Sequence, residues 1–253
     1  MLPRAPDFRL DGRPALVTGG SRGIGLAAAV ALAQAGAAVT LAARSAADLE
    51  AAAQEMRQAG LACDTLVLDV TDSKAVTREL AQRAPFRILV NNAGMNRPKP
   101  LVELEDQDID AVLDLNVKAA FYVTRAVARG LLAAGLPGSV INVSSQMGHV
   151  GGPRRTLYCA SKHAIEGMTK ALAWELGSAG IRVNSLCPTF IETAMTAPMF
   201  QDAGFREWAT RNIALGRIGR PEEVMGAVVF LASDASSLMT GSALMLDGGW
   251  TAA

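Results

Sequence analysis

The sequence is poor in cysteine and histidine. Its three cysteines, Cys63, Cys159 and Cys187, lie far apart, and the 253 residues contain two histidines. There is no CxxC pair and no histidine-rich segment, and an odd number of distant cysteines does not suggest a disulfide framework. We therefore expect no metal site and a reducing, cytoplasmic compartment.

An excess of charge of either sign is lacking as well. Lys plus Arg and Asp plus Glu both number 24, and neither sign forms a long run. A protein that binds nucleic acid or an anionic membrane surface is expected to show a basic patch or stripe. The expected partner is therefore a small molecule, with no nucleic acid and no membrane.

Long uninterrupted hydrophobic runs are also scarce. Residues 1–14 carry several charges and no apolar core of the kind found in a signal peptide. The apolar stretch 26–43 approaches the length of a membrane span, but Gln34, Gly36 and Thr40 interrupt it. We expect a helix that ends near Gly36 in a left-handed conformation, followed by a buried strand at 38–43.

Seven short apolar runs alternate with segments of helical periodicity. They are residues 15–18, 38–43, 65–68, 88–91, 139–143, 182–186 and 243–246. Apolar strands separated by helices indicate βαβ units and a parallel sheet. The sequence predicts an α/β fold, a doubly wound Rossmann-type parallel sheet of seven strands with helices on both faces, in a single dinucleotide-binding catalytic domain over residues 1–253.

Residues 189–219 depart from this regularity. The segment contains methionine, phenylalanine and tryptophan but has weak periodicity. Two interpretations remain open, a lid over a substrate and a helical insertion that closes the core.

Glycine is concentrated between the first predicted strand and the helix after it, where residues 18–25 read TGGSRGIG. Glycine permits positive φ and lets backbone amides approach a pyrophosphate, and a helix N-terminus attracts an anion. A purely structural glycine turn is the alternative. We expect these residues to bind a dinucleotide: Gly19, Ser21, Arg22, Gly23, Ile24 and Gly25.

The spacing TGxxxGxG resembles that of the short-chain dehydrogenase/reductase family in its single-domain form. Further matches occur in the family's order: NNAG at residues 91–94, YxxxK at residues 158–162 and DGG at residues 247–249. The resemblance implies that Asp69 and Val70 lie beside an adenine and that Thr193 contacts a nicotinamide carboxamide. It implies further cofactor contacts for Asn92, Ala93, Gly94, Tyr158, Lys162, Pro188 and Ile191.

The end of the second predicted strand indicates which nicotinamide is used. NAD sites usually place an acid there, to accept hydrogen bonds from the ribose 2′-OH. Residues 42–45 read AARS instead, with no carboxylate. Because Arg44, helped by Arg22, offers donors suited to a phosphate, we expect NADP(H) as the cofactor. The alternative is that both arginines are solvated or pair with neighbouring acids, and NAD(H) then remains open.

The same resemblance implies a catalytic group formed by Asn116, Ser145, Tyr158 and Lys162. Tyr158 would exchange a proton with a carbonyl or alcohol during hydride transfer, and Ser145 would hydrogen-bond the substrate oxygen. Asn116 would hold a water in a proton relay to the lysine, unless it only repairs a helix backbone. Adjacent Ser144 competes for the serine role, but neighbours on a strand point to opposite faces, and the spacing favours Ser145.

Tyr158 and Lys162 are four residues apart, so on the helix expected over 159–176 they share one face. A nearby ammonium group stabilises a phenolate. We therefore expect Lys162, together with an oxidised nicotinamide, to lower the pKa of Tyr158 from about 10 towards neutrality.

Further residues lie near these motifs. His149 is expected either to contact substrate or to be structural, whereas His163 and Cys159 are expected to pack. Met147, Met195 and Met199 are expected to line an apolar pocket wall or to fill the core. Thr189 stands where the family usually has glycine and narrows the turn that meets the nicotinamide.

Four cations, Arg97, Lys99, Arg154 and Arg155, lie in segments that border the substrate in the family. They favour an anionic or polyhydroxylated substrate, and residues 95–97 and 247–250 are similar to members that act on sugar acids. A 3-oxoacyl-thioester reductase, acting on acyl carrier protein or coenzyme A, is the alternative. Steroids and cyclic ketones also remain open.

A catalytically silent nucleotide-binding protein is an alternative of another class, although such relatives typically lose the tyrosine or the lysine. The resemblance also implies a homotetramer built through the helices that carry Asn116 and Tyr158.

Overall fold

Short apolar segments form every strand of the sheet in the computed structural model, which describes residues 2–252. All seven strands are parallel, in the order β3-β2-β1-β4-β5-β6-β7. The strands are β1 (Pro14–Thr18), β2 (Ala38–Ala43), β3 (Cys63–Val67), β4 (Ile88–Asn91), β5 (Gly138–Val143), β6 (Ile181–Pro188) and β7 (Ala243–Leu246). The predicted doubly wound sheet is confirmed.

Four strands differ from their predicted bounds: β1 and β5 begin one residue early, and β3 and β6 differ at both ends. β3 begins at Cys63, two residues early, because Cys63 and Asp64 pair with Val39 and Thr40 of β2. Apolar runs alone did not predict this pairing, because Asp64 is polar. At the other side of the sheet β6 continues to Pro188, which pairs with Leu246 of β7.

Helices cover both faces of the sheet, as expected for parallel strands joined by crossovers. The α-helices are α1 (Gly23–Gln34), α2 (Ala46–Gln58), α3 (Ser73–Ala81), α4 (Asp106–Leu113), α5 (Ala119–Ala134), α6 (Thr156–Leu176), α7 (Ala203–Arg211) and α8 (Glu222–Ala232). The shorter turns are η1 (Leu101–Glu103), η3 (Gln146–Gly148), η4 (Gly177–Ala179), η5 (Met199–Gln201), η6 (Asp234–Ser236) and η7 (Trp250–Ala252), with a π-helical turn at η2 (Asp114–Lys118).

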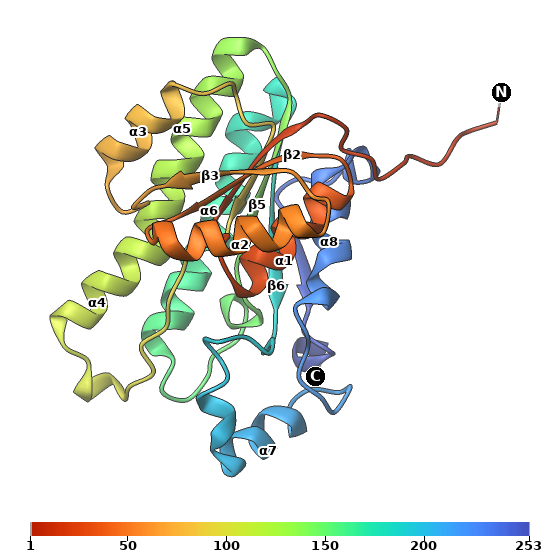
Figure 1. Ribbon diagram of the computed structural model, residues 1–253. Helices are drawn as coiled ribbons and strands as arrows, with labels where there is room; N and C mark the ends of the chain where they lie inside the picture. The colour runs from red at the N-terminus through yellow and green to blue at the C-terminus, as the bar shows by residue number, and fades with distance from the viewer. Residues whose placement is uncertain (1, 253) are drawn as a thin grey trace.

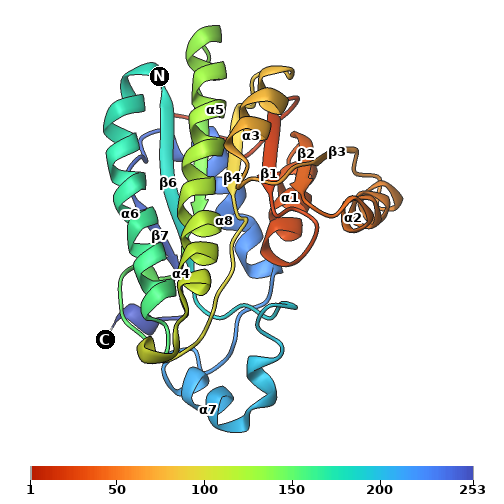
Figure 2. The same cartoon turned by 90° about the vertical axis from the view of Figure 1, so that its left-hand side faces the viewer.

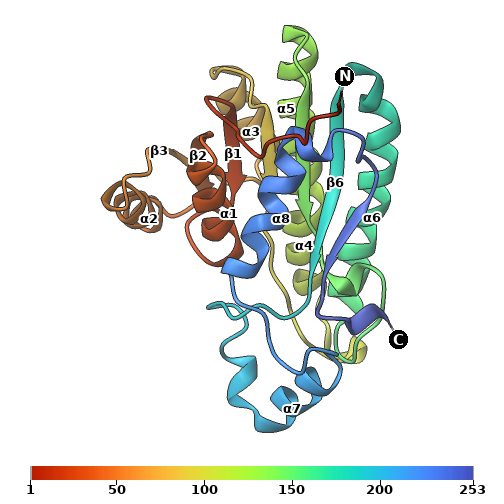
Figure 3. The same ribbon diagram turned by 90° about the vertical axis from the view of Figure 1, so that its right-hand side faces the viewer.

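The core is divided by the sheet into two layers. Neighbouring residues such as Leu16 and Val17 are both fully buried but belong to opposite layers, because successive side chains of a strand point to opposite faces. One layer packs against α1, α2 and α8, and α1 and α8 lie in front of the sheet in Figure 3. The other packs against α3, α5 and α6, which face the viewer in Figure 2.

The apolar stretch after the glycine loop folds as α1 and β2. Gly36 lies between them with φ +100°, and a Cβ there would meet Asp11 Oδ1 at 2.2 Å, so a left-handed glycine is required as expected. Within residues 2–252 there is no helix long and apolar enough to cross a membrane.

The irregular segment 189–219 forms η5 and α7 below the carboxyl ends of the strands (Figure 1). Its two ends are joined by a parallel bridge between Ile191 and Gly219. It has an aromatic core of its own, which includes Phe190, Phe200, Phe205, Trp208 and Trp250. The segment therefore closes one end of the fold, and whether it also moves as a lid stays a prediction.

Candidate active site

A cavity of about 390 Å³ opens where the loops after β1, β4, β5 and β6 meet. The chain runs from β1 outward to β3 and returns to β4, which lies beside β1. In doubly wound sheets such a reversal leaves a crevice at the carboxyl ends of the strands, where ligands bind. The glycine loop and the NNAG segment therefore face each other across this opening.

Asn92 ties these two loops together. Its Nδ2 donates to the carbonyl oxygens of Thr18 and Gly19, both at 3.0 Å, and its backbone N–H donates to Thr18 Oγ1 at 3.1 Å. A Cβ on Gly25 would lie 2.2 Å from the Gly19 carbonyl oxygen. Gly25 thus lets α1 approach the loop but, unlike Gly19 and Gly23, does not line the cavity.

The N-terminus of α1 faces the cavity, and no side chain of the described residues caps its first turn. Its N-cap residue, Arg22, makes no capping hydrogen bond within the described residues, and the helix begins at Gly23 with φ +56°. Uncapped amides at a helix N-terminus bind phosphate well. The loop therefore fits the pyrophosphate of a dinucleotide.

Arg44 and Arg22 both line this end of the cavity and are solvent-exposed. In the part of the chain that the structure describes, neither forms an ion pair, so pairing with neighbouring acids does not account for them. Asp69 lies outside the cavity lining and accepts hydrogen bonds from the N–H and hydroxyl of Thr71. The other expected cofactor contacts at the cavity are Ser21, Ile24, Val70, Ala93, Gly94, Pro188, Ile191 and Thr193.

Tyr158 and Lys162 lie on one face at the start of α6, both against the cavity. The helix begins at Thr156, three residues earlier than predicted, so Tyr158 is in its first turn. The Lys162 ammonium donates a 2.8 Å hydrogen bond to the Val143 carbonyl and lies 5.5 Å from the centre of the Tyr158 ring. The lysine is buried and the tyrosine half-buried.

Burial acts on the pKa of Tyr158 in the direction opposite to the effect expected from Lys162 and an oxidised nicotinamide. Burial raises the pKa of Tyr158 to about 12, and the Ser145 hydroxyl opposes this only in part. Burial also lowers the pKa of Lys162 to about 8. The sequence-based expectation counted the attraction between the charged groups but not the loss of water around them, and the effect of the bound nicotinamide stays a prediction.

The Ser145 hydroxyl is held by its neighbour Gln146. Ser145 Oγ donates to Gln146 Oε1 at 2.6 Å and accepts from the backbone N–H of Met147 at 3.1 Å. The hydroxyl of Ser144 is buried and has no hydrogen-bond partner among the described residues. It is Ser145 that approaches Tyr158, in the place that the spacing predicted.

Known proteins resemble this chain along almost its whole length. A family model described as enoyl-(acyl carrier protein) reductase matches residues 19–251. Gluconate 5-dehydrogenase of Gluconobacter oxydans is 41% identical over 97% of this chain and 98% of its own. The 3-oxoacyl-[acyl-carrier-protein] reductase of Thermotoga maritima is 42% identical over 96% of this chain and 99% of its own.

The chain belongs to the short-chain dehydrogenase/reductase family. It is an oxidoreductase of that family, as the motifs predicted. The crystal structure of a gluconate 5-dehydrogenase from Burkholderia cenocepacia, in complex with NADP and tartrate, superimposes with a TM-score of 0.93 at 38% identity. That similarity covers 97% of this chain and 98% of the other.

Asn116, which the family resemblance placed in a proton relay, lies in the π-helical turn between α4 and α5. Its Oδ1 accepts from the N–H of Met95 at 2.8 Å, and its Nδ2 donates to the Met95 carbonyl and to Ser161 Oγ. The side chain thus joins the loop after β4 to α6 and does not line the main cavity. π-Turns within helices often occur at functional sites.

Only one of the four cations expected at the substrate lines the cavity of this dehydrogenase/reductase. Lys99 forms a 2.6 Å ion pair with Asp108, and Arg97 lies 3.9 Å from the same carboxylate. Arg154 is exposed with φ +60°. These three side chains are satisfied by Asp108 or by solvent and do not line the cavity, so a contact with substrate stays a prediction for them.

Arg155 is different, because it is 7% exposed and lines the cavity. Its guanidinium lies over the Phe205 ring, 5.9 Å from the centre, and donates to Met199 Sδ at 3.3 Å and to the Arg154 carbonyl. No acid pairs with it within residues 2–252. Burial lowers the pKa of Arg155, in keeping with a guanidinium that is almost fully removed from water.

The histidines and cysteines lie outside the cavity lining. His163 Nδ1 is 2.9 Å from the Cys159 carbonyl oxygen, a structural contact as expected. His149 points away from the cavity, towards Glu166 and Cys187. All three cysteines are free.

Several residues at the site were missed by sequence reasoning. Gln146 belongs to no motif, and Asn96 lies two residues beyond NNAG in a stretch that was noted without a role for the asparagine itself. Asn96 Oδ1 and Thr189 Oγ1 are buried, lack a hydrogen-bond partner among the described residues, and belong to residues that line the cavity. Met147, Met195 and Met199 line it too, as expected.

Proposed function

We propose that this protein is an NADP(H)-dependent oxidoreductase that interconverts a ketone and a secondary alcohol on a sugar-acid or polyol substrate. The single observation that carries the substrate class is Arg155, a buried cation without an acid partner at the cavity. A buried unpaired charge is costly, and an anionic group of a substrate would compensate it.

The nicotinamide, when bound, supplies or accepts the hydride. Tyr158, whose pKa of about 12 keeps it protonated at neutral pH, donates its proton to the carbonyl oxygen in the direction of reduction. Ser145, whose oxygen is held by the backbone N–H of Met147, turns its hydroxyl from Gln146 Oε1 to the same substrate oxygen and donates a hydrogen bond to it. Lys162 returns a proton to Tyr158 after the tyrosine has given up its own. Asn116 fixes the loop after β4 against α6.

The preference for NADP(H) rests on Arg44 and Arg22. Two exposed guanidinium groups without acid partners line the cavity beside the end of β2, where an NAD enzyme commonly places a carboxylate. Bidentate donation to a phosphate is the interaction that arginine makes best. The relative from Burkholderia cenocepacia binds NADP with the same fold, which supports the proposal.

Hydrogen-bonding groups in the cavity favour a hydroxylated substrate. Asn96 Oδ1 and Thr189 Oγ1 are buried acceptors without partners, and substrate hydroxyl groups would satisfy them. The related gluconate 5-dehydrogenase holds tartrate, a molecule that carries both carboxylates and hydroxyl groups. A 3-oxoacyl thioester is the second candidate, since the relative from Thermotoga maritima acts on that class.

A substrate panel tests the proposal. Purified protein is assayed with NADP(H) and NAD(H) against sugar acids, neutral polyols, 3-oxoacyl thioesters and cyclic ketones, and nicotinamide absorbance is followed. We expect the highest kcat/KM for a sugar acid with NADP(H). A preference for the thioester would overturn the substrate class, and failure with every substrate would favour a silent nucleotide-binding protein.

We also propose assembly into a homotetramer through α5 and α6. Trp174 on α6 is 91% exposed and Phe121 on α5 is 48% exposed, although both are large and apolar. Burial of such side chains between copies would stabilise an oligomer. Light scattering on the purified chain tests this, and a monomeric mass would overturn it.

A further inference from the structure

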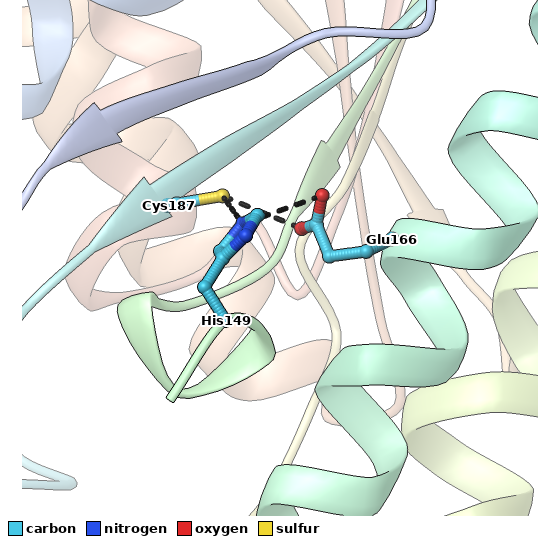
Figure 4. Close-up of side chains that lie close together, drawn as sticks. All are labelled: His149, Glu166 and Cys187. Atoms are coloured by element: carbon cyan, nitrogen blue, oxygen red, sulfur yellow. Dashed lines mark hydrogen bonds and ion pairs between the residues drawn. The ribbon is translucent and has the colours of Figure 1, made fainter. Parts of the chain in front are cut away.

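His149, Glu166 and Cys187 come together beside the active site but outside its cavity. They belong to the loop after η3, to the middle of α6 and to the end of β6 (Figure 4). A metal ion needs at least three histidine, cysteine or acidic side chains close together. In the described part of the chain, these three residues form the one such group. The proposed reaction uses none of them.

The three donor atoms, one from each residue, lie within 4.8 Å of one another, and the shortest separations use different oxygens of Glu166. His149 Nε2 lies 3.6 Å from Cys187 Sγ and 3.5 Å from Glu166 Oε2, and Cys187 Sγ lies 3.3 Å from Glu166 Oε1. At Zn–S, Zn–N and Zn–O distances of about 2.3, 2.0 and 2.0 Å, tetrahedral angles separate the donors by about 3.3 to 3.6 Å. A rotation of the Glu166 carboxylate that brings one oxygen to both partners would therefore complete the arrangement for such an ion.

The surroundings also suit a metal site. Cys187 and Glu166 are 0% and 5% exposed, and Ser185 Oγ donates a 2.8 Å hydrogen bond to Glu166 Oε2, which orients the carboxylate. The side chain of His149 is 31% exposed, which leaves a path for an ion and for a water ligand. Lys162, one turn before Glu166 on α6, directs its ammonium group to the Val143 carbonyl.

We propose that His149, Glu166 and Cys187 bind one zinc ion with water as the fourth ligand. A thiolate, an imidazole and a carboxylate suit zinc, whereas calcium and magnesium take oxygen ligands. The ion has a structural role, because its three ligands join the segment after Ser145, the helix of Tyr158 and the strand that ends at Pro188. Sequence spacing gave no hint of it, since the ligands are separated by 17 and 21 residues.

Metal titration of the full chain tests the site without measuring activity. Protein without an affinity tag is stripped with a chelator and titrated with Zn²⁺ in a calorimeter and with Co²⁺ in a spectrophotometer. We expect one ion per chain and, with Co²⁺, a thiolate-to-metal charge-transfer band with the visible bands of tetrahedral cobalt. Zinc should raise Tm by roughly 5 to 10 °C at about a hundredfold excess over Kd.

The composition of the chain supplies matched controls. Cys187→Ala should abolish the charge-transfer band and His149→Ala should abolish the zinc-induced shift in Tm, whereas Cys63→Ala and His163→Ala should retain both. Because His149 is partly exposed, His149→Ala is expected to fold even if substitution of the buried Cys187 disturbs the core. Wild-type protein without the band and without the shift in Tm would overturn the proposal, as would a band that survives in folded Cys187→Ala.

Discussion

Lys162 donates its 2.8 Å hydrogen bond to the Val143 carbonyl and not to Tyr158. The ammonium group is thereby fixed between the end of β5 and the first turns of α6, with the tyrosine ring 5.5 Å away. In the proposed mechanism the lysine acts on the tyrosine through its charge and through the bound cofactor and substrate, since it has no direct hydrogen bond to the tyrosine. The first two predictions depend on this arrangement.

Removal of the Tyr158 hydroxyl should stop the reaction while leaving cofactor binding almost intact. For Tyr158→Phe we expect kcat to fall by about 10² to 10⁴ or more, the range of general acid–base catalysis. NADPH affinity, measured by fluorescence titration, should stay within a few fold. The chain has one other tyrosine, Tyr122 on α5, so Tyr122→Phe is the matched control. Full activity of Tyr158→Phe would disprove the proposed mechanism.

The buried lysine should give the stability of the fold a specific pH dependence. The pKa of Lys162 is about 8 in the folded protein and 10.5 ordinarily. Between these values the unfolded chain binds more protons, so this residue makes the free energy of unfolding rise with pH, by about 3 kcal/mol in total. Below pH 8 Lys162 is charged in both states, so the full cost of burying its charge lowers the free energy of unfolding.

Urea denaturation of the wild type and of Lys162→Met, at pH 7.0 and at pH 10.0, measures this effect. A chelator is present so that the proposed zinc site stays empty. The wild type should gain stability relative to the variant at the higher pH. Lys170→Met, on an exposed position of the same helix, should show no such difference. An equal pH response in wild type and Lys162→Met would contradict the prediction.

Arg44 should distinguish the two nicotinamide cofactors. Hydrogen bonds to a charged group contribute about 1.5 to 3 kcal/mol, so Arg44→Ala should weaken NADPH binding by about tenfold or more and leave NADH binding nearly unchanged. Titration of both cofactors against both proteins measures this. Arg57→Ala, at the far end of α2, serves as the control. Equal loss for both cofactors would show that Arg44 does not recognise a phosphate.

Arg155 should govern the affinity for an anionic substrate. Loss of one partner from a buried charge pair costs about 2 to 5 kcal/mol, so Arg155→Leu should raise KM for a sugar acid by about 30-fold or more. KM for a neutral polyol should change much less, and Arg155→Lys should recover part of the loss. Arg154→Leu, at the exposed neighbouring position, is the control.

The Tm of Arg155→Leu distinguishes a role in substrate binding from a purely structural role. Because the guanidinium is buried without an acid partner, its removal should leave Tm unchanged or higher in the absence of substrate. A large drop in Tm together with equal changes in KM for both substrates would mean that Arg155 only supports the aromatic core around Phe205.

The sequence by itself determined the strands, the glycine loop and the pairing of Tyr158 with Lys162 on one helix face. These features depend on local periodicity and on spacing along one element, so β2, β4 and β7 were predicted to the residue. The reversal of strand order that opens the cavity also follows, since parallel strands with short crossovers allow few topologies.

Only the tertiary structure decided which polar groups meet. Asp108 neutralises Lys99, Gln146 holds Ser145, and Arg155 is left as the buried cation, although the sequence offers four similar candidates. Burial raises the pKa of Tyr158, and sequence spacing does not reveal this effect because burial depends on every element around the side chain. His149, Glu166 and Cys187 converge from three separate elements for the same reason: packing across the sheet, and not distance along the chain, sets which side chains become neighbours.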